Sequence, residues 1–296
     1  MMYLLGSIVL SSYLTIAFKL CDRFNINKLH AIVFNYLTCA VTGSLVIGAV
    51  PNYSRYTAEP WFFYALMMGA LFFVTFNLIA LAVQKSGLAV ASVASKLSLI
   101  IPFTVSIFLY NETVGWMKIA GIILALVAVL FTLYPSKTNN SITPNTSTLS
   151  FDKIILPLIV FIGTGVVDTT VKYVQHHFIT DANNDDYLIS TFTAAFAVGF
   201  FYLGILLLRK KEKFQPTSVL AGIAIGIPNY FSIWCLVHVL KKYGDSSSVI
   251  IPVNNMGIVL FSAIVAWLFF REKLTRTNWF GIALSIAAIL LIAFGK

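Results

Sequence analysis

The chain has 296 residues, of which 59% are hydrophobic, 15% aromatic and only 10% charged, and its net charge is +9. Soluble domains carry about 25% charged residues, so this composition excludes an ordinary soluble domain and indicates a protein surrounded by lipid. Most of the Lys and Arg residues lie in short loops between apolar stretches, so nucleic acid is not an expected partner. The three scattered cysteines, Cys21, Cys39 and Cys235, form neither a disulfide framework nor a metal-site pattern, and no cofactor motif is present.

Apolar stretches long enough to cross a bilayer recur along the whole chain. About 20 mostly apolar residues span the hydrocarbon core as a helix. The first stretch lacks a basic leader, so we expect it to be a retained span rather than a cleaved signal. Ten spans are predicted, at 2–21, 29–49, 60–84, 88–110, 115–134, 153–175, 186–208, 217–240, 246–270 and 276–294.

The two halves of the chain repeat each other across a polar linker at 135–151, which is rich in Ser, Thr and Asn. At an offset of 153 residues, Ser11, Thr15 and Lys19 align with Thr164, Asp168 and Lys172. The later spans align at offsets that drift in one direction, as small loop insertions would cause. The sequence therefore predicts a first repeat at 1–134 and a second repeat at 152–296.

Five spans per repeat is an odd number, which returns the chain to the opposite side of the membrane. The second repeat is therefore inserted upside down relative to the first, as in many secondary transporters whose sites lie between inverted halves. The predicted fold is an all-α polytopic membrane protein with ten transmembrane helices, arranged as two inverted five-helix repeats around a central cavity.

Each repeat ends in a glutamate, a spacer and a glycine that opens an aliphatic helix: Glu112 with Gly121, and Glu272 with Gly281. This pattern resembles the element that closes each half in the drug/metabolite transporter superfamily, in its EamA-like branch. The resemblance covers nearly the whole chain and implies a transporter of small solutes such as amino acids, sugars, purines or drugs. It also implies that both glutamates are architectural.

The orientation in the membrane is left open by two opposing signals. Most loop cations lie after the odd-numbered spans, including Arg209, Lys210, Lys211 and Lys213, which places both termini outside. The family resemblance implies both termini inside.

Polar residues recur every four residues on the first and sixth spans, through Ser11, Thr15 and Lys19 and through Thr164, Asp168 and Lys172. Such a stripe faces one side of a helix and could line the solute path. The alternative is that the hydroxyls bond their own backbone and the lysines reach the interface. Asp168 and Lys172 have the spacing of a helical ion pair, and Asp168 could also exchange a proton during transport.

Lys96 lies about nine residues into the fourth span, too deep to reach the interface easily. In the second half the corresponding region contains Asn254 and Asn255. A buried cation opposite amides could hold a carboxylate or phosphate; the alternative is a structural pair with Asp168. Pro102 and Pro252 free backbone carbonyls in these spans, which is common near transport sites.

Aromatic and amide residues on the third and eighth spans could form a pocket wall. Tyr230 and Trp234 are four residues apart, and Asn77 matches Trp234 in the first half. Packing between helices explains these residues equally well.

Together these patterns predict a secondary, non-ATP transporter of a small polar or amphipathic metabolite, such as an amino acid or another anionic solute, that works by alternating access. It would not be an enzyme. It would reside in a bacterial inner membrane and could form a homodimer through the fifth and tenth spans, which are rich in small and aliphatic residues. The alternatives are a multidrug or cation efflux pump, and a lipid flippase or lipid-processing membrane protein.

Overall fold

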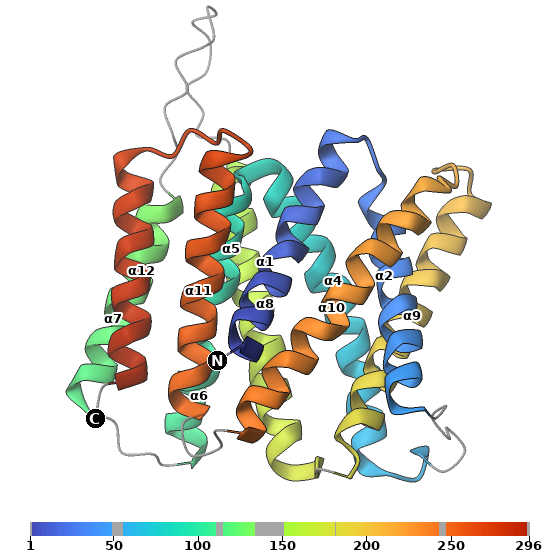
Figure 1. Ribbon diagram of the computed structural model, residues 1–296, viewed down its shortest axis with the longest axis horizontal. Coiled ribbons are helices and arrows are strands. Elements are labelled where there is room, and N and C mark those ends of the chain that lie inside the picture. Colours follow the sequence, from blue (N-terminus) through green and yellow to red (C-terminus); the bar gives the residue numbers. More distant parts are fainter. Residues whose placement is uncertain are drawn as a thin grey trace, which may run out of the picture.

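The protein is all-helical in the computed structural model, which describes residues 2–48, 56–110, 115–133, 151–180, 182–242 and 247–294. The predicted linker at 135–151 and the motif residue Glu112 lie outside these ranges, apart from residue 151 itself. The helices are α1 (Met2–Arg23), α2 (Lys28–Ile47), α4 (Pro60–Ser86), α5 (Leu88–Leu97), α6 (Ile100–Tyr110), α7 (Trp116–Leu133), α8 (Phe151–Phe178), α9 (Asn184–Leu208), α10 (Thr217–Lys242), α11 (Ser247–Leu268) and α12 (Arg276–Phe294) (Figure 1).

Within the described residues, eight segments are long and apolar enough to cross a membrane, and two shorter apolar helices lie in α7 and α12. Lipid offers no hydrogen-bond partners, so a spanning segment must satisfy its backbone internally, which a helix does. Large apolar side chains such as Leu5, Phe63 and Phe201 are exposed on the outside. The chain is therefore an integral, multi-pass membrane protein.

The predicted fourth span is one membrane-crossing stretch, Leu88–Val105, in which a turn at Ser98 and Leu99 separates α5 from α6. The cause is Pro102, which has no backbone N–H to donate to the Ser98 carbonyl. Pro102 is instead the third residue of α6, where the amides of a first turn need no intrahelical partner. In contrast, α11 accommodates Pro252 without interruption.

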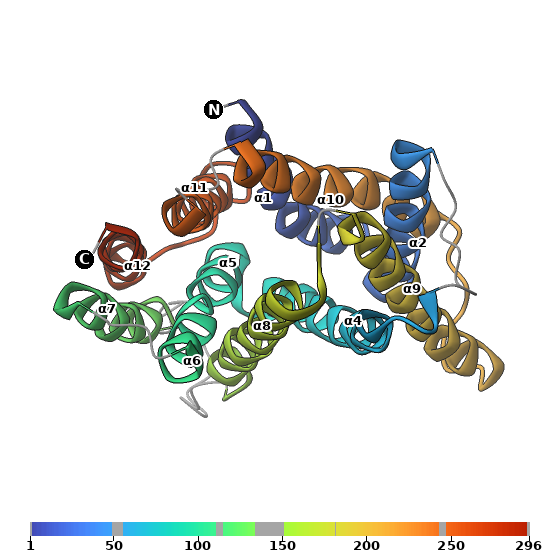
Figure 2. The ribbon, with the colours of Figure 1, turned by 90° about the horizontal axis from the view of Figure 1, so that it is seen from below.

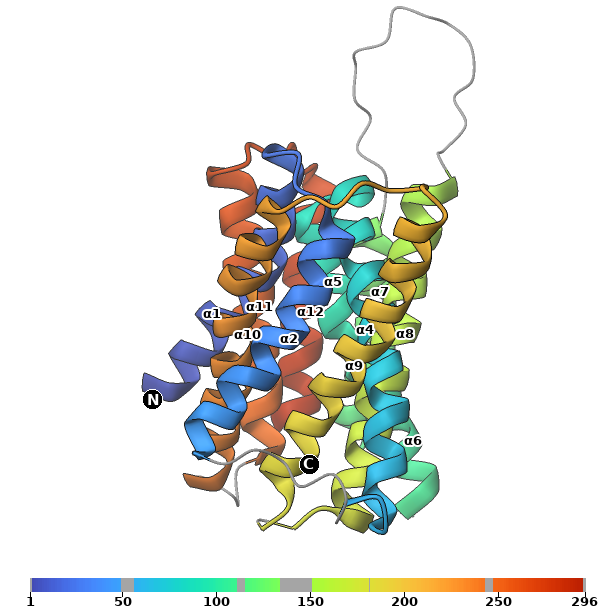
Figure 3. The same cartoon turned by 90° about the vertical axis from the view of Figure 1, so that its right-hand side faces the viewer.

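The helices form two rows, each of which combines helices from both halves (Figure 2). One row contains α12, α11, α1, α10 and α2, and the other contains α7, α5 with α6, α8, α4 and α9. Helices α2 and α9 meet at one end of the bundle (Figure 3), and α7 packs against α12 at the other. The main contacts are the same in both halves. In the repeat, α10 corresponds to α4 and α9 corresponds to α2; α10 packs on α2, and α4 packs on α9. Counterparts such as α1 and α8 run in opposite directions (Figure 1).

Small residues on α7 and α12 allow these two helices to approach closely within the chain. A Cβ atom on Gly281 would lie 2.4 Å from Thr132 Oγ1 and 2.6 Å from the Thr132 amide. Asn278 reinforces the contact by donating to the Thr132 carbonyl at 2.9 Å. Gly281, the glycine of the closing motif, therefore allows α12 to pack closely on α7 of the other half. A homodimer through these helices stays a prediction.

Gly69 in α4 gives a direct test of packing between the halves. A Cβ atom there would lie 2.5 Å from Ala194 Cβ and 2.6 Å from the Ala195 amide of α9. We expect Gly69→Ala to destabilise the protein by about 1–3 kcal/mol, because a well-packed contact cannot absorb a methyl group. Gly204→Ala is the matched control, since nothing lies within 4 Å of the added atom. Thermal unfolding in detergent measures both; equal melting temperatures would contradict the α4–α9 packing.

Candidate functional site

The break between α5 and α6 places two polar side chains in the interior of the bundle. Lys96 is in the last turn of α5 and is partly buried. Ser98 occupies the turn itself, is fully buried, and donates to the Ser95 carbonyl at 2.6 Å. Interrupted helices near the middle of a membrane protein are tolerated where they line a cavity or are covered by protein. The sequence signal for this break was Pro102.

Asp168 of α8 comes to the same place from the second half of the chain. Its Oδ2 lies 3.2 Å from Ser98 Oγ, which shares its single proton between this carboxylate and the closer Ser95 carbonyl. The outward face of α8 carries Ile162 and Val166, and Asp168 lies roughly 200° around the helix from Val166. Its side chain is nevertheless exposed. Asp168 therefore faces the neighbouring helices α5 and α6 rather than the outward side of α8.

Lys96, Ser98 and Asp168, which we call the central cluster, combine opposite charges without a direct ion pair. The charges of Lys96 and Asp168 interact across the interface between the halves. None of the ion pairs formed by described side chains joins Lys96 to Asp168. Ser98 is the nearest polar neighbour of the carboxylate among the described side chains, and the roles expected for Lys96, Asp168 and Lys172 stay predictions. Both charged groups keep capacity for a ligand.

Polar atoms without a protein partner lie on the helices next to the central cluster. Helix α5 packs against α11, and α11 packs against α1. Buried and without a hydrogen bond are Ser92 Oγ on α5, Asn254 Oδ1 on α11 and Ser7 Oγ on α1. Asn255, beside Asn254, is partly buried. Unsatisfied buried polar atoms cost about 1–3 kcal/mol each, so a ligand or water that bonds them is favoured.

The hydroxyls of the predicted stripes bond mainly to their own helices. Thr164 is buried and donates to the Val160 carbonyl at 2.6 Å, one turn from Asp168. Ser11 is partly buried on α1, and its neighbour Ser12 donates to the Ile8 carbonyl at 2.7 Å. These contacts match the backbone-bonding alternative, although Thr164 and Asp168 share one face of α8.

Tyr230 and Trp234 lie along α10 in packing contacts. A Cβ atom on Gly43 of α2 would lie 2.9 Å from the Tyr230 ring, and Tyr230 is buried. The Trp234 ring lies 3.7 Å from that of His238 and 5.7 Å from that of Tyr3, between centroids. The structure therefore places these aromatics at the contacts of α10 with α2 and α1. Among the described residues, no hydrogen bond or ring contact joins them to the central cluster.

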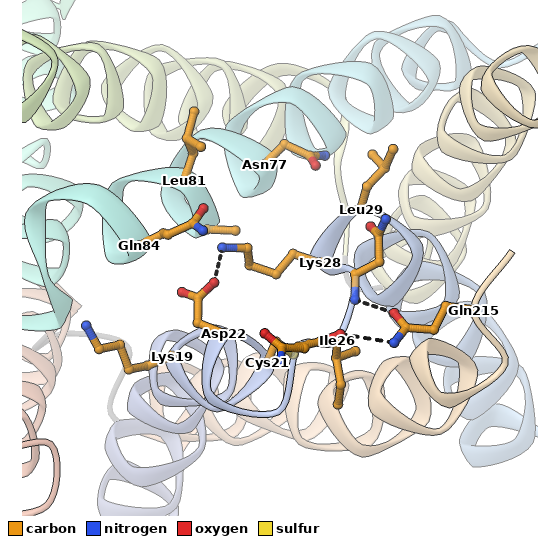
Figure 4. A pocket seen from close by; sticks show the side chains of 13 residues that line it. Lys19, Cys21, Asp22, Ile26, Lys28, Leu29, Asn77, Leu81, Gln84 and Gln215 are labelled. Carbon is orange, nitrogen blue, oxygen red and sulfur yellow. Dashed lines mark hydrogen bonds and ion pairs between the residues drawn. The ribbon is translucent and has the colours of Figure 1, made fainter. Parts of the chain in front are cut away.

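A cavity of about 790 Å³ opens at the end of the bundle where α1 ends and α2 begins, with α4 beside it (Figure 4). We call it the end cavity. Asn77 lines it and donates to the Phe73 carbonyl of its own helix at 2.7 Å. Lys28 extends toward Asp22 and forms an ion pair with its Oδ1 at 2.5 Å (Figure 4). Leu81, Gln84 and Gln215 are among the other lining residues.

Glu272 joins the second half to the first beside the end cavity. Its carboxylate forms an ion pair with Lys19 Nζ at 3.1 Å and accepts from the Leu88 amide at 2.9 Å. It thereby caps the first turn of α5, where the orphan amides and the helix dipole favour an anion. The preceding Gly87 has φ +97°, and a Cβ atom there would lie 3.0 Å from Glu272. The architectural role expected for Glu272 is what the structure shows.

Two polar contacts between the halves had no signal in the sequence. Asn229 of α10 donates to Asn35 Oδ1 of α2 at 3.1 Å in a buried setting. At the end cavity, Gln215 accepts from the Asn27 amide at 2.6 Å and donates to the Asn25 carbonyl at 3.0 Å. Single amides in apolar or loop segments form no periodic pattern, and their partners lie far away in the sequence.

Comparison with known proteins agrees with this architecture. The model of the EamA-like transporter family matches residues 1–134 and 150–294, nearly the whole chain. The chain belongs to the EamA-like transporter family. An uncharacterised protein of Haemophilus influenzae is 26% identical over 300 residues, covering 98% of this chain and 97% of its own. A solved crystal structure matches with a TM-score of 0.61 at 16% identity, covering 98% of this chain and 94% of its own, which shows a shared fold.

Membership of the EamA-like family identifies a membrane transporter of small solutes. The uncharacterised relative adds no substrate. The chemistry of the central cluster is therefore the main guide to what this EamA-like protein carries.

Proposed function

We propose that this EamA-like protein is a secondary transporter of a small metabolite that carries a carboxylate, such as an amino acid, and that Lys96 holds the carboxylate. The observation that carries the proposal is the Lys96 ammonium. It lies inside the bundle, at the break between α5 and α6, without an ion pair among the described residues. A charged group at this depth is costly in a membrane protein and typically marks a substrate or ion pathway.

The arrangement of the halves supports alternating access as the mechanism in this proposal. The central cluster combines Lys96 and Ser98 from the first half with Asp168 from the second. A solute bound there would contact both halves, so rocking of one against the other would expose it first on one side and then on the other. Coupling to protons through Asp168, and residence in a bacterial inner membrane, are parts of this proposal.

A transport screen in liposomes tests the proposal. Purified protein is reconstituted, and exchange of labelled solutes is measured for carboxylates and for their primary amides, which have nearly the same shape. We expect the carboxylate of at least one pair to be transported and its amide to be transported roughly tenfold less well or worse, because a charge-assisted hydrogen bond is lost.

Two outcomes would overturn the proposal. Equal transport of acid and amide would remove the role of the carboxylate. Transport restricted to organic cations would favour a multidrug efflux pump instead, with Asp168 as the binding acid.

A further inference from the structure

The end cavity brings opposite charges together at one end of the bundle, away from the central cluster. Lys19 and Asp22 line it from α1, and Lys28 lines it from the start of α2. The side chains of all three are partly exposed, at 26%, 23% and 16%. The volume of about 790 Å³ lies within the usual range of pockets for small molecules.

The charges around the end cavity are balanced in pairs. Lys28 is paired with Asp22, and Lys19 is paired with Glu272. Asn77, Gln84 and Gln215 add amide donors and acceptors to the wall. Glu272 lies outside the lining, so the wall itself offers a solute two ammonium groups, one carboxylate and neutral hydrogen-bonding groups.

A zwitterionic solute can supply a new partner to each member of the Lys28–Asp22 pair: its carboxylate can bind Lys28, and its ammonium can bind Asp22. Lys28 reaches across the cavity to Asp22 (Figure 4). If a solute carboxylate binds the Lys28 ammonium, Asp22 loses its cation. A solute that also carries an ammonium restores that contact, whereas a plain carboxylate leaves Asp22 unpaired at a cost. The pair therefore selects solutes with both charges.

The central cluster repeats this combination deeper in the bundle. Lys96 and Asp168 again provide one ammonium and one carboxylate that interact without direct contact. Lys96 lies eight residues beyond Leu88, the residue that Glu272 caps, or about 12 Å further along α5. The two charge pairs therefore follow one another along the bundle.

We propose that the end cavity is an entrance binding site for zwitterionic solutes, in which Asp22 binds the ammonium and Lys28 the carboxylate before transfer to Asp168 and Lys96. This inference rests on the proposed function and narrows its substrate class from carboxylates to solutes that also carry an ammonium. Removing either member of the Asp22–Lys28 pair removes one of the two contacts.

Protection of a single cysteine reports occupancy of the end cavity directly. Leu81 lines the cavity and is 38% exposed, so Leu81→Cys provides a reactive thiol there. Its alkylation by a maleimide is followed by peptide mass spectrometry, which separates it from the three native cysteines. The probes are the standard L-amino acids, each compared with its deaminated acid and with its decarboxylated amine.

We expect at least one amino acid to slow alkylation at position 81, while its deaminated acid and its amine do so about tenfold less well. Asp22→Asn should weaken the protection by a similar factor. The double variant Lys96→Met/Asp168→Asn should keep the protection and lose transport. This last contrast separates the entrance site from the central cluster.

Other results would overturn the inference. Equal protection by an amino acid and its deaminated acid would show that the cavity does not recognise the ammonium group of the solute. Absence of protection by every amino acid in the panel would show that zwitterions do not bind here. Transport of a carboxylate that lacks an ammonium, without protection, would overturn the entrance site and leave the proposed function standing.

Discussion

Replacing Lys96 with methionine is expected to raise the half-saturating concentration of a transported carboxylate by roughly 10- to 100-fold, or to stop its transport. Methionine keeps much of the length and apolar stem of lysine but removes the ammonium. A hydrogen bond to a charged group contributes about 1.5–3 kcal/mol, and each 1.4 kcal/mol corresponds to about tenfold in affinity. The measurement is the concentration dependence of exchange in liposomes.

Loss of Lys96 also leaves Asp168 without the opposite charge that interacts with it, so a folding defect must be separated from a binding defect. Lys96→Met/Asp168→Asn removes both charges and should recover thermal stability without recovering transport. Lys211→Met, in the exposed loop after α9, is the control for loss of a lysine as such. If the double variant transports the carboxylate as the parent does, the central cluster is not the binding site.

The second large effect is expected at Glu272, whose carboxylate contacts Lys19 and the first turn of α5. Glu272→Ala removes both contacts and should lower stability by about 1–2 kcal/mol for the lost cap, with a further loss for the unpaired lysine. Glu272→Gln keeps an oxygen that can accept from the Leu88 amide and loses only the charge. We expect the melting temperature of the Gln variant to lie between those of Ala and the parent.

A double-mutant cycle isolates the ion pair. Lys19→Met and Glu272→Gln each break the pair, so their combined effect on unfolding should be smaller than the sum of the two. Additive effects would show that Glu272 acts only through the α5 amides. Both variants should also speed alkylation of Leu81→Cys, because the contact holds the two halves together beside the end cavity.

The spans could be predicted from the sequence because each must satisfy its backbone hydrogen bonds within its own helix. Each also needs a similar length of apolar residues to cross the bilayer. Lys96 and Asp168 could be singled out for a similar reason, since charge within an apolar helix is costly and therefore conspicuous. The split of the fourth span was within reach, because Pro102 removes a backbone donor there. The contact of Asp168 with the turn at Ser98 had no signal in the sequence, and the ion pairs weighed for Asp168 stay predictions.

Partners across the halves could not be predicted. Glu272 and Leu88 are 184 residues apart, and Asn229 and Asn35 are 194 apart. Their meeting depends on how the two rows of helices pack, which no local spacing encodes. Tyr230 and Trp234 illustrate the converse: their spacing fits a pocket wall and helix packing equally, and the structure places them in packing contacts.

One half of the bundle is interrupted and the other is not. The turn at Ser98 opens the backbone of the first half at the central cluster, whereas α11 continues through Pro252. The two inverted halves are therefore not equivalent where they meet at the central cluster, and we expect the apparent affinities for a transported solute to differ between the two faces of the membrane.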